Sequence, residues 1–164
     1  MAELGKADEG VDQIREAIGG LSAGPGEFWS TYFLAQLAEA CGRADRVGEG
    51  LRAIAKALQF IKQTGERWWE AEILRLQGEL LLKQNDSNAA QAQSCFEQAI
   101  QVAREQGAKS LELRAVMSLS RLWQSQRKER RACEQLVEIY TGFTEGLDTP
   151  DLTEAKALLD KLSN

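Results

Sequence analysis

Residues 70–100 read EAEILRLQGELLLKQNDSNAAQAQSCFEQAI, and this stretch decides the fold. Apolar or small side chains recur in it at spacings of four and three residues. They are Leu74, Gly78 and Leu81, then Ala92, Phe96 and Ala99. These spacings place side chains on one face of an α-helix. Asp86 and Ser87, between the two triplets, are residue types that cap helix starts. The stretch therefore predicts a helical hairpin.

The second triplet recurs along the chain at a regular distance. Its copies are Gly10, Ile14 and Ala17; Gly50, Ile54 and Ala57; Ala92, Phe96 and Ala99; and Ala132, Leu136 and Ile139. Their middle members follow one another by 40, 42 and 40 residues. An unrelated feature keeps the same distances: Phe28-Trp29 precedes Trp68-Trp69 by 40 residues, and Ser110-Leu111 follows 42 residues later. Two independent features with one period indicate an internal repeat.

Similar periodicity and turn residues predict helices along the whole chain. We expect helices over residues 7–20, 27–42, 45–63, 67–84, 88–106, 109–126, 129–142 and 150–162. Gly65 and Gly107 follow predicted helices, where a left-handed residue is favoured. Thr149-Pro150 has the composition of a helix start. No segment shows sustained two-residue alternation, so no sheet is expected.

The repeat predicts an all-α fold, a right-handed α-solenoid of helical hairpins with a period of about 40–42 residues. We expect a single domain that consists of a half repeat (1–26), three repeats (27–66, 67–108 and 109–146) and a C-terminal capping helix (147–164). The first helix has no preceding partner helix, which leaves part of its apolar surface exposed. Its apolar residues are Leu4, Val11, Ile14, Ile18 and Leu21. Exposed apolar surface often marks an interface, so a homodimer through this end is one expectation.

Composition excludes several classes of function. The net charge of −5 gives no general attraction to nucleic acid or to anionic membranes. No apolar run approaches the roughly 18 residues needed to span a bilayer, and no signal-peptide core is present, so a cytoplasmic location is expected. The chain has no histidine, which excludes Ser-His, Cys-His and His-metal sites. We expect no catalytic residue, no metal and no cofactor.

Three further features have ordinary structural interpretations. Cys41, Cys95 and Cys133 lie on or beside predicted core faces, which favours buried free thiols. The basic run over residues 127–131 has no interleaved aromatic residues, and cations are favourable at a helix C-terminus, so a solvated turn is expected. The tryptophans Trp29, Trp68 and Trp69 could form a ledge for a partner. Their recurrence at the repeat period favours packing between neighbouring hairpins instead.

The triplets resemble those of tetratricopeptide repeats, and the best match spans residues 74–99. The period of 40–42 residues, against about 34 in the common form, looks like the long-repeat variety of large bacterial signalling proteins. Residues 65–72, 76–82, 108–115 and 143–152 are similar to the C-terminal repeat region of bacterial predicted ATPases. Such regions are often fused to nucleotide-cyclase, kinase or transcription-factor modules. The resemblance implies a sensory or partner-binding role.

The family's concave groove implies a set of partner-binding positions. By register these are Tyr32, Ala35, Glu39 and Arg43; Glu72, Arg75, Glu79 and Lys83; and Arg114, Met117, Arg121 and Gln124. Arginine is enriched among interface hot spots, so Arg75, Arg114 and Arg121 are the expected anchors. Opposite charges at i,i+4, as in Arg75 and Glu79, also allow the groove to be a solvated ladder of ion pairs without a ligand.

Three functions remain open from the sequence. The first is a protein-interaction scaffold or regulatory module, related to a larger bacterial signalling ATPase. The second is a sensor that binds a small molecule or signalling peptide in the groove, and the third is self-assembly. We expect a protein or peptide as the partner, and neither nucleic acid nor a membrane.

Overall fold

The computed structural model describes residues 8–16 and 30–163, and within these ranges the chain is helical with no β-strand. Residues 8–16 form the first described helix. The others are α2 (Ser30–Arg43), α3 (Val47–Thr64), α4 (Glu70–Gln84), α5 (Ala89–Glu105), α6 (Lys109–Ser125), α7 (Glu129–Tyr140) and α8 (Pro150–Leu162), with a short 3-10 helix η2 (Asp86–Asn88). From residue 45 onward, every predicted helix begins and ends within three residues of the observed bounds. The all-helical prediction is confirmed.

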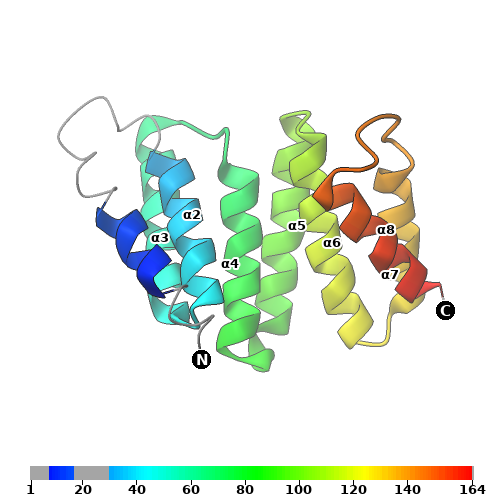
Figure 1. Ribbon diagram of the computed structural model, residues 1–164, viewed down its shortest axis with the longest axis horizontal. Helices are drawn as coiled ribbons and strands as arrows, with labels where there is room; N and C mark the ends of the chain where they lie inside the picture. The colour runs from blue at the N-terminus through cyan, green and yellow to red at the C-terminus, as the bar shows by residue number, and fades with distance from the viewer. Residues whose placement is uncertain (1–7, 17–29, 164) are drawn as a thin grey trace.

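The helices pack in sequence order, each against the next one along the chain, and form one elongated array (Figure 1). The even-numbered and the odd-numbered helices form two rows, which differ in whether neighbouring members of a row contact each other. In the even row (α2, α4, α6 and α8), each helix touches the next member of the row. In the odd row (α3, α5 and α7), no such contact exists between the described residues. The even row is therefore the more closely spaced, and its members meet directly from one hairpin to the next.

Most members of the repeated triplets lie in the core, although Ile14 and Ile139 are only partly buried. The positions expected to be buried are all less than one-tenth exposed: Ile54, Ala57, Leu74, Phe96, Ala99 and Leu136. The largest cluster joins α4, α5, α6, α7 and α8, and a second joins α2, α3 and α4. Because α4 contributes to both clusters, it connects the two ends of the array.

The turns follow the expected backbone conformations with one difference in capping. Gly65 and Gly107 have φ values of 75° and 65°, the left-handed conformation predicted for them. The middle turn contains η2, which accounts for the 42-residue distance where the others are 40. The expected cap of α5 by Asp86 or Ser87 is wrong: both residues lie in η2, and Asn88 precedes α5 without a side-chain capping bond. The side chain of Asn85 caps η2 by accepting a hydrogen bond from the Ser87 amide at 2.9 Å. Pro150 opens α8 as predicted, although Thr149 makes no capping bond with its side chain.

The helix over residues 8–16 packs on α2. Val11 is fully buried among Ala40, Cys41 and Ala44. Arg46 ties the same helix to the start of α3 through a hydrogen bond from its Nη1 to Asp12 Oδ1 at 3.3 Å. Of the apolar residues expected on the first helix, Leu4, Ile18 and Leu21 lie outside the described residues. No described helix combines the length and the apolar character needed to cross a membrane.

Candidate functional site

A cleft of about 390 Å³ runs along the even row and is lined by all four of its helices. Of the predicted groove positions, seven line it: Glu39, Glu72, Arg75, Glu79, Arg114, Met117 and Arg121. Gln36, Asp151 and Glu154 complete the lining. The repeat register therefore brings side chains from separate hairpins to one surface, as the sequence implies.

A buried ion pair on α4 forms the floor of the cleft. The Arg75 guanidinium donates from Nη2 to Glu72 Oε1 at 2.7 Å and from Nε to Oε2 at 2.9 Å. The side chains of Glu72 and Arg75 are only 5% and 11% exposed. Burial lowers the pKa of Arg75, but the hydrogen bonds to Glu72 and the charges of Glu72 and Glu79 raise this pKa overall above its usual value. Arg75 therefore stays charged, and its donors are already occupied.

Glu79 links this pair to the next hairpin. Its Oε1 contacts Arg75 and accepts a hydrogen bond from the Ser118 hydroxyl of α6 at 2.8 Å. Ser118 is buried, so this bond lies between α4 and α6 and away from solvent. Polar groups in such a place are stable only when they are paired, and here every member has a partner.

Two carboxylates of α8 complete the cleft. Arg114 donates from Nε to Asp151 Oδ2 at 2.7 Å, and its Nη1 lies 3.6 Å from Glu72 Oε1. Arg121 donates from Nη2 to Glu154 Oε1 at 2.6 Å. Partial burial lowers the pKa of Arg114, whereas the bond to Asp151 and the charge of Glu72 raise it, and the net change is upward. All three expected arginine anchors thus have carboxylate partners within the protein.

The charges of the cleft sum to a negative value. Five carboxylates (Glu39, Glu72, Glu79, Asp151 and Glu154) face three guanidinium groups (Arg75, Arg114 and Arg121). Glu39 and Glu79 are each about two-fifths exposed, and Glu154 is more exposed still. The carboxylates are therefore in excess and are among the more accessible charges, which suits a cationic group better than an anionic one.

The remaining predicted positions lie beside the cleft. Arg43 and Lys83 line a smaller pocket of about 160 Å³ between α2 and α4. Arg43 bonds to Glu39 at 3.0 Å, and Lys83 Nζ donates to the Gly42 carbonyl at 2.5 Å. Ala35 is fully buried within the core. Gln124 lies at the far end of α6, half-buried, and does not line the cleft.

Tyr32 belongs to an aromatic group at one end of α2 and α4. Its ring stacks on Trp68 with centroids 6.3 Å apart and meets Trp69 edge-on at 5.4 Å. These contacts join neighbouring hairpins, which is the packing expected for the recurring tryptophans. Trp68 keeps 36% of its surface exposed, so this ring is not fully enclosed. Trp29 lies outside the described residues.

Sequence reasoning did not find the contribution of α8. The sequence predicts this helix as a cap and no part of the groove, whereas Asp151 and Glu154 pair with arginines of α6. The spacing of three residues, which places both carboxylates on one face opposite the basic face of α6, is a signal that could have found them. Gln36 carries no comparable signal, because a single glutamine on an amphipathic helix is ordinary.

Apart from Gln36 and Met117, the side chains that line the cleft are charged. Within residues 8–16 and 30–163, no three His, Cys, Asp or Glu side chains are grouped so as to hold a metal ion. Burial raises the pKa of the thiols of Cys41 and Cys95, which makes them less reactive at neutral pH.

The chain matches no protein-family model and no curated protein.

Proposed function

We propose that this chain is a protein-interaction or regulatory module of the tetratricopeptide kind, and that the even-row cleft binds a peptide segment of its partner. One observation carries the proposal: three helices from separate hairpins and the final helix α8 contribute charged side chains to a single cleft. A packed array needs no such gathering of charge for its stability. Buried ion pairs are weak evidence for stability, because their desolvation cost can exceed their attraction.

The excess of carboxylates favours a partner segment with lysine or arginine. Arg75 is nearly enclosed, so it orders Glu72 and Glu79 more readily than it reaches a partner. Arg114 and Arg121 are about two-fifths exposed and can exchange their α8 carboxylates for carboxylates of the partner. The segment that fits best therefore has cationic side chains opposite α2 and α4 and an acidic residue opposite α6.

The resemblance of the 65–72 and 143–152 strings supports a place for this module in bacterial signalling ATPases. In such proteins the repeats bind or sense, and the ATPase lies elsewhere. A small-molecule sensor is the second candidate, because about 390 Å³ lies within the usual size range of ligand pockets. Such pockets are mostly apolar, whereas only Met117 among the lining residues of this cleft has an apolar side chain, so the peptide is favoured.

A displayed peptide library tests this function directly. Selection against the protein is expected to enrich peptides rich in lysine and arginine. Their affinity is expected to fall about three- to tenfold in Glu79→Gln with Glu154→Gln, because partly exposed charge pairs contribute only about 1 kcal/mol in total.

Glu97→Gln, on the exposed surface of α5, is the matched control and is expected to leave the affinity unchanged. Failure to enrich any peptide family would contradict the proposal. Enriched peptides that bind the cleft variant as well as the unmodified protein would place the site elsewhere. A melting screen with small anions and cations covers the sensor alternative, since a specific ligand raises the melting temperature.

A further inference from the structure

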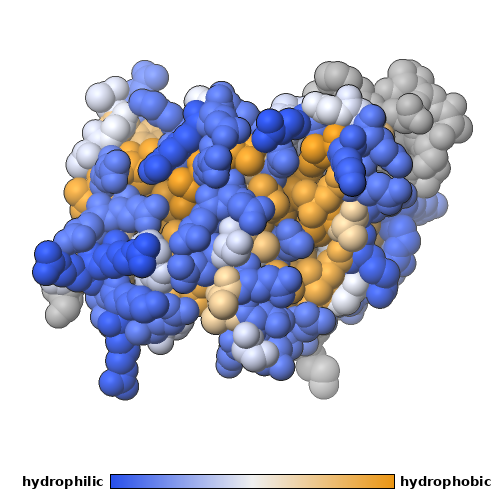
Figure 2. All heavy atoms as spheres, turned by 180° about the vertical axis from the view of Figure 1, so that it is seen from behind, coloured by the Kyte–Doolittle hydropathy of each residue, from blue (hydrophilic) through white to orange (hydrophobic). Residues whose placement is uncertain are grey.

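The outward surfaces of the odd row carry a charge that reverses along the chain. At three equivalent repeat positions α3 has Arg52, Ala55 and Lys56, α5 has Ser94, Glu97 and Gln98, and α7 has Glu134, Val137 and Glu138. All nine are exposed. Seen from behind, the molecule shows ridges of hydrophilic side chains with hydrophobic ones between them (Figure 2). Packing of the helices does not require the charge to reverse at positions that face water. The reversal therefore has a different cause.

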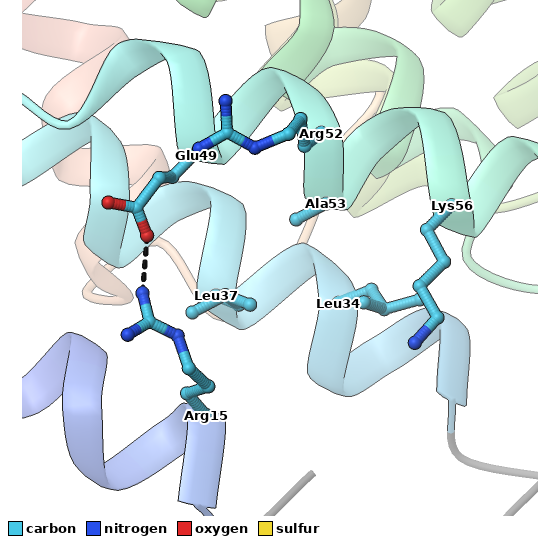
Figure 3. A pocket seen from close by; sticks show the side chains of 7 residues that line it. All are labelled: Arg15, Leu34, Leu37, Glu49, Arg52, Ala53 and Lys56. Atoms are coloured by element: carbon cyan, nitrogen blue, oxygen red, sulfur yellow. Dashed lines mark hydrogen bonds and ion pairs between the residues drawn. The ribbon is translucent and has the colours of Figure 1, made fainter. Parts of the chain in front are cut away.

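At the N-terminal end a hollow lies between the helix over residues 8–16, α2 and α3. Its volume is about 260 Å³. Leu34 and Leu37 of α2, with Ala53 of α3, provide its apolar lining (Figure 3). Arg52 and Lys56 also line it, from the neighbouring face of α3. The hollow therefore combines an apolar surface with a cationic edge.

Arg52 and Lys56 make no hydrogen bond or ion pair with the described residues. Glu49 is the one acidic side chain of the lining, and it already contacts Arg15 and accepts bonds from Arg46 at 2.8 and 2.9 Å. These bonds, with the nearby positive charges, lower the pKa of Glu49. Because Glu49 is shared between two arginines, the hollow keeps a net positive charge.

The C-terminal end presents the complementary surface. Val137 of α7 is 41% exposed, one of the few large hydrophobic side chains that the described residues leave open to solvent. Glu134 and Glu138 flank it at i−3 and i+1, so all three lie on one face of α7. Glu134 pairs with Arg130 at 2.8 Å, but both side chains are well exposed, and such a pair contributes little and exchanges readily.

We propose that copies of this chain associate head to tail, with α7 of one copy docked in the hollow of the next. Val137 then lies on the leucines, and Glu134 and Glu138 meet Arg52 and Lys56. The contact joins two different surfaces, so every open assembly keeps one free hollow at one end and one free α7 at the other, and growth continues as an open chain or closes as a ring. The occupant is a second copy because the chain itself carries both the apolar and the charged complement. This contact uses the odd row and is independent of the cleft proposed above.

Sedimentation velocity over a concentration series tests the proposal with the full chain. The mean mass is expected to rise past that of a dimer as the concentration increases to roughly 1 mM, where even a millimolar contact is substantially populated. Two variants reverse one surface each: Arg52→Glu with Lys56→Glu, and Glu134→Lys with Glu138→Lys. Each is expected to stay monomeric alone, and an equal mixture of the two is expected to regain association, because each reversed surface complements the other.

Glu97→Lys, on the outward surface of α5 at the position equivalent to Val137, is the control for a reversed charge outside the two proposed surfaces and is expected to associate as the unmodified chain does. All substituted side chains are exposed, and an unchanged circular dichroism spectrum verifies the fold. An unmodified chain that stays monomeric throughout overturns the proposal. A mixture that remains monomeric also overturns it. Dimerisation of the Glu134→Lys, Glu138→Lys variant alone would indicate the symmetric contact through the N-terminal end instead.

Discussion

The first hairpin (α2 and α3) and the middle hairpin (α4 and α5) fill the same repeat positions with different volumes. In the middle hairpin Gly78 faces Phe96, and a Cβ atom on Gly78 would lie 2.5 Å from the phenyl ring. The first hairpin has Ala38 and Ile54 at these positions, both buried in one cluster. A larger side chain on one helix thus goes with a smaller one on the other.

In the first hairpin the glycine at the close contact is Gly50, which lies on the second helix of the hairpin, whereas Gly78 lies on the first helix of its own. A Cβ atom on Gly50 would lie 3.2 Å from the Ala38 carbonyl oxygen and 3.0 Å from Leu80, whereas the middle hairpin has Ala92 at this position. The two hairpins therefore keep the helices close by different means. What the repeat preserves is the total volume between its helices, because interiors are packed as densely as organic crystals.

The largest loss of stability is expected at Phe96, the position where the two hairpins differ most in side-chain volume. Phe96→Ala removes a fully buried ring beside a glycine that cannot fill the space, and is expected to lower the free energy of unfolding by about 3–5 kcal/mol. Ile54→Ala in the first hairpin removes less volume and is expected to cost less. Urea denaturation of both variants measures the difference. A cost below about 1 kcal/mol for Phe96→Ala would show that the Phe96 ring contributes little to the packing of the middle hairpin.

Breaking the buried ion pair of Glu72 and Arg75 is expected to give the next largest loss of stability. Of the two hairpins compared, the middle one has this pair and the first does not. The first hairpin has Tyr32 and Ala35 where the middle one has Glu72 and Arg75. Glu72→Ala leaves a nearly enclosed guanidinium with Glu79 as its main partner, and is expected to cost about 3 kcal/mol.

The control for this effect replaces both charges. Glu72→Met with Arg75→Leu removes the pair without stranding either charge, and is expected to recover most of the stability. Denaturation midpoints of the single and double variants give the comparison. A double variant less stable than Glu72→Ala would mean that the pair itself stabilises the hairpin. Peptide binding to the cleft is expected to weaken in both variants.

A smaller effect is expected at Gly78. Gly78→Ala gains about 1 kcal/mol of helix propensity but forces a methyl group against the Phe96 ring, so a net loss of about 1–2 kcal/mol is expected. Combining it with Phe96→Ile reproduces the composition of the first hairpin, and the two changes are expected to cost less together than their sum. Gly48→Ala, where the nearest atom is the far end of Arg52 at 3.8 Å, is the control and is expected not to destabilise. If the losses of stability of Gly78→Ala and Phe96→Ile simply add in the double variant, the two positions are not coupled through one contact.

The sequence predicted the parts of this structure that depend on local spacing. The helices, the burial of Ile54 and Phe96, and the left-handed Gly65 all follow from periodicity and from glycine chemistry. The cleft was predicted in part, because the groove positions that the family resemblance implies, carried over by register, include seven of its lining residues. Pairing across elements was not predicted. The spacing of Asp151 and Glu154 places both on one face of α8, but which carboxylate each arginine takes depends on how α8 lies against α6.

The smallest effect concerns the junction of α6 and α8, the last contact of the even row. Arg114 and Asp151 bond at 2.7 Å there, but their side chains are 39% and 31% exposed, so water competes for them. Asp151→Asn is expected to cost about 0.5–1 kcal/mol, part of it from the lost interaction of the carboxylate with the N-terminus of α8. The buried pair of Glu72 and Arg75 is shielded from salt, whereas this one is not.

Salt therefore separates the two pairs, because ions screen exposed charges far more than buried ones. In high salt the cost of Asp151→Asn is expected to shrink towards zero, while the cost of Glu72→Ala persists. In an Arg114→Gln background, Asp151→Asn is expected to retain only the helix-terminus contribution, a few tenths of a kcal/mol. A cost that is large and independent of salt would mean that Arg114 and Asp151 are enclosed like the α4 pair. The C-terminal end of the cleft would then be as rigid as its floor, and Arg114 could not exchange Asp151 for a carboxylate of a partner.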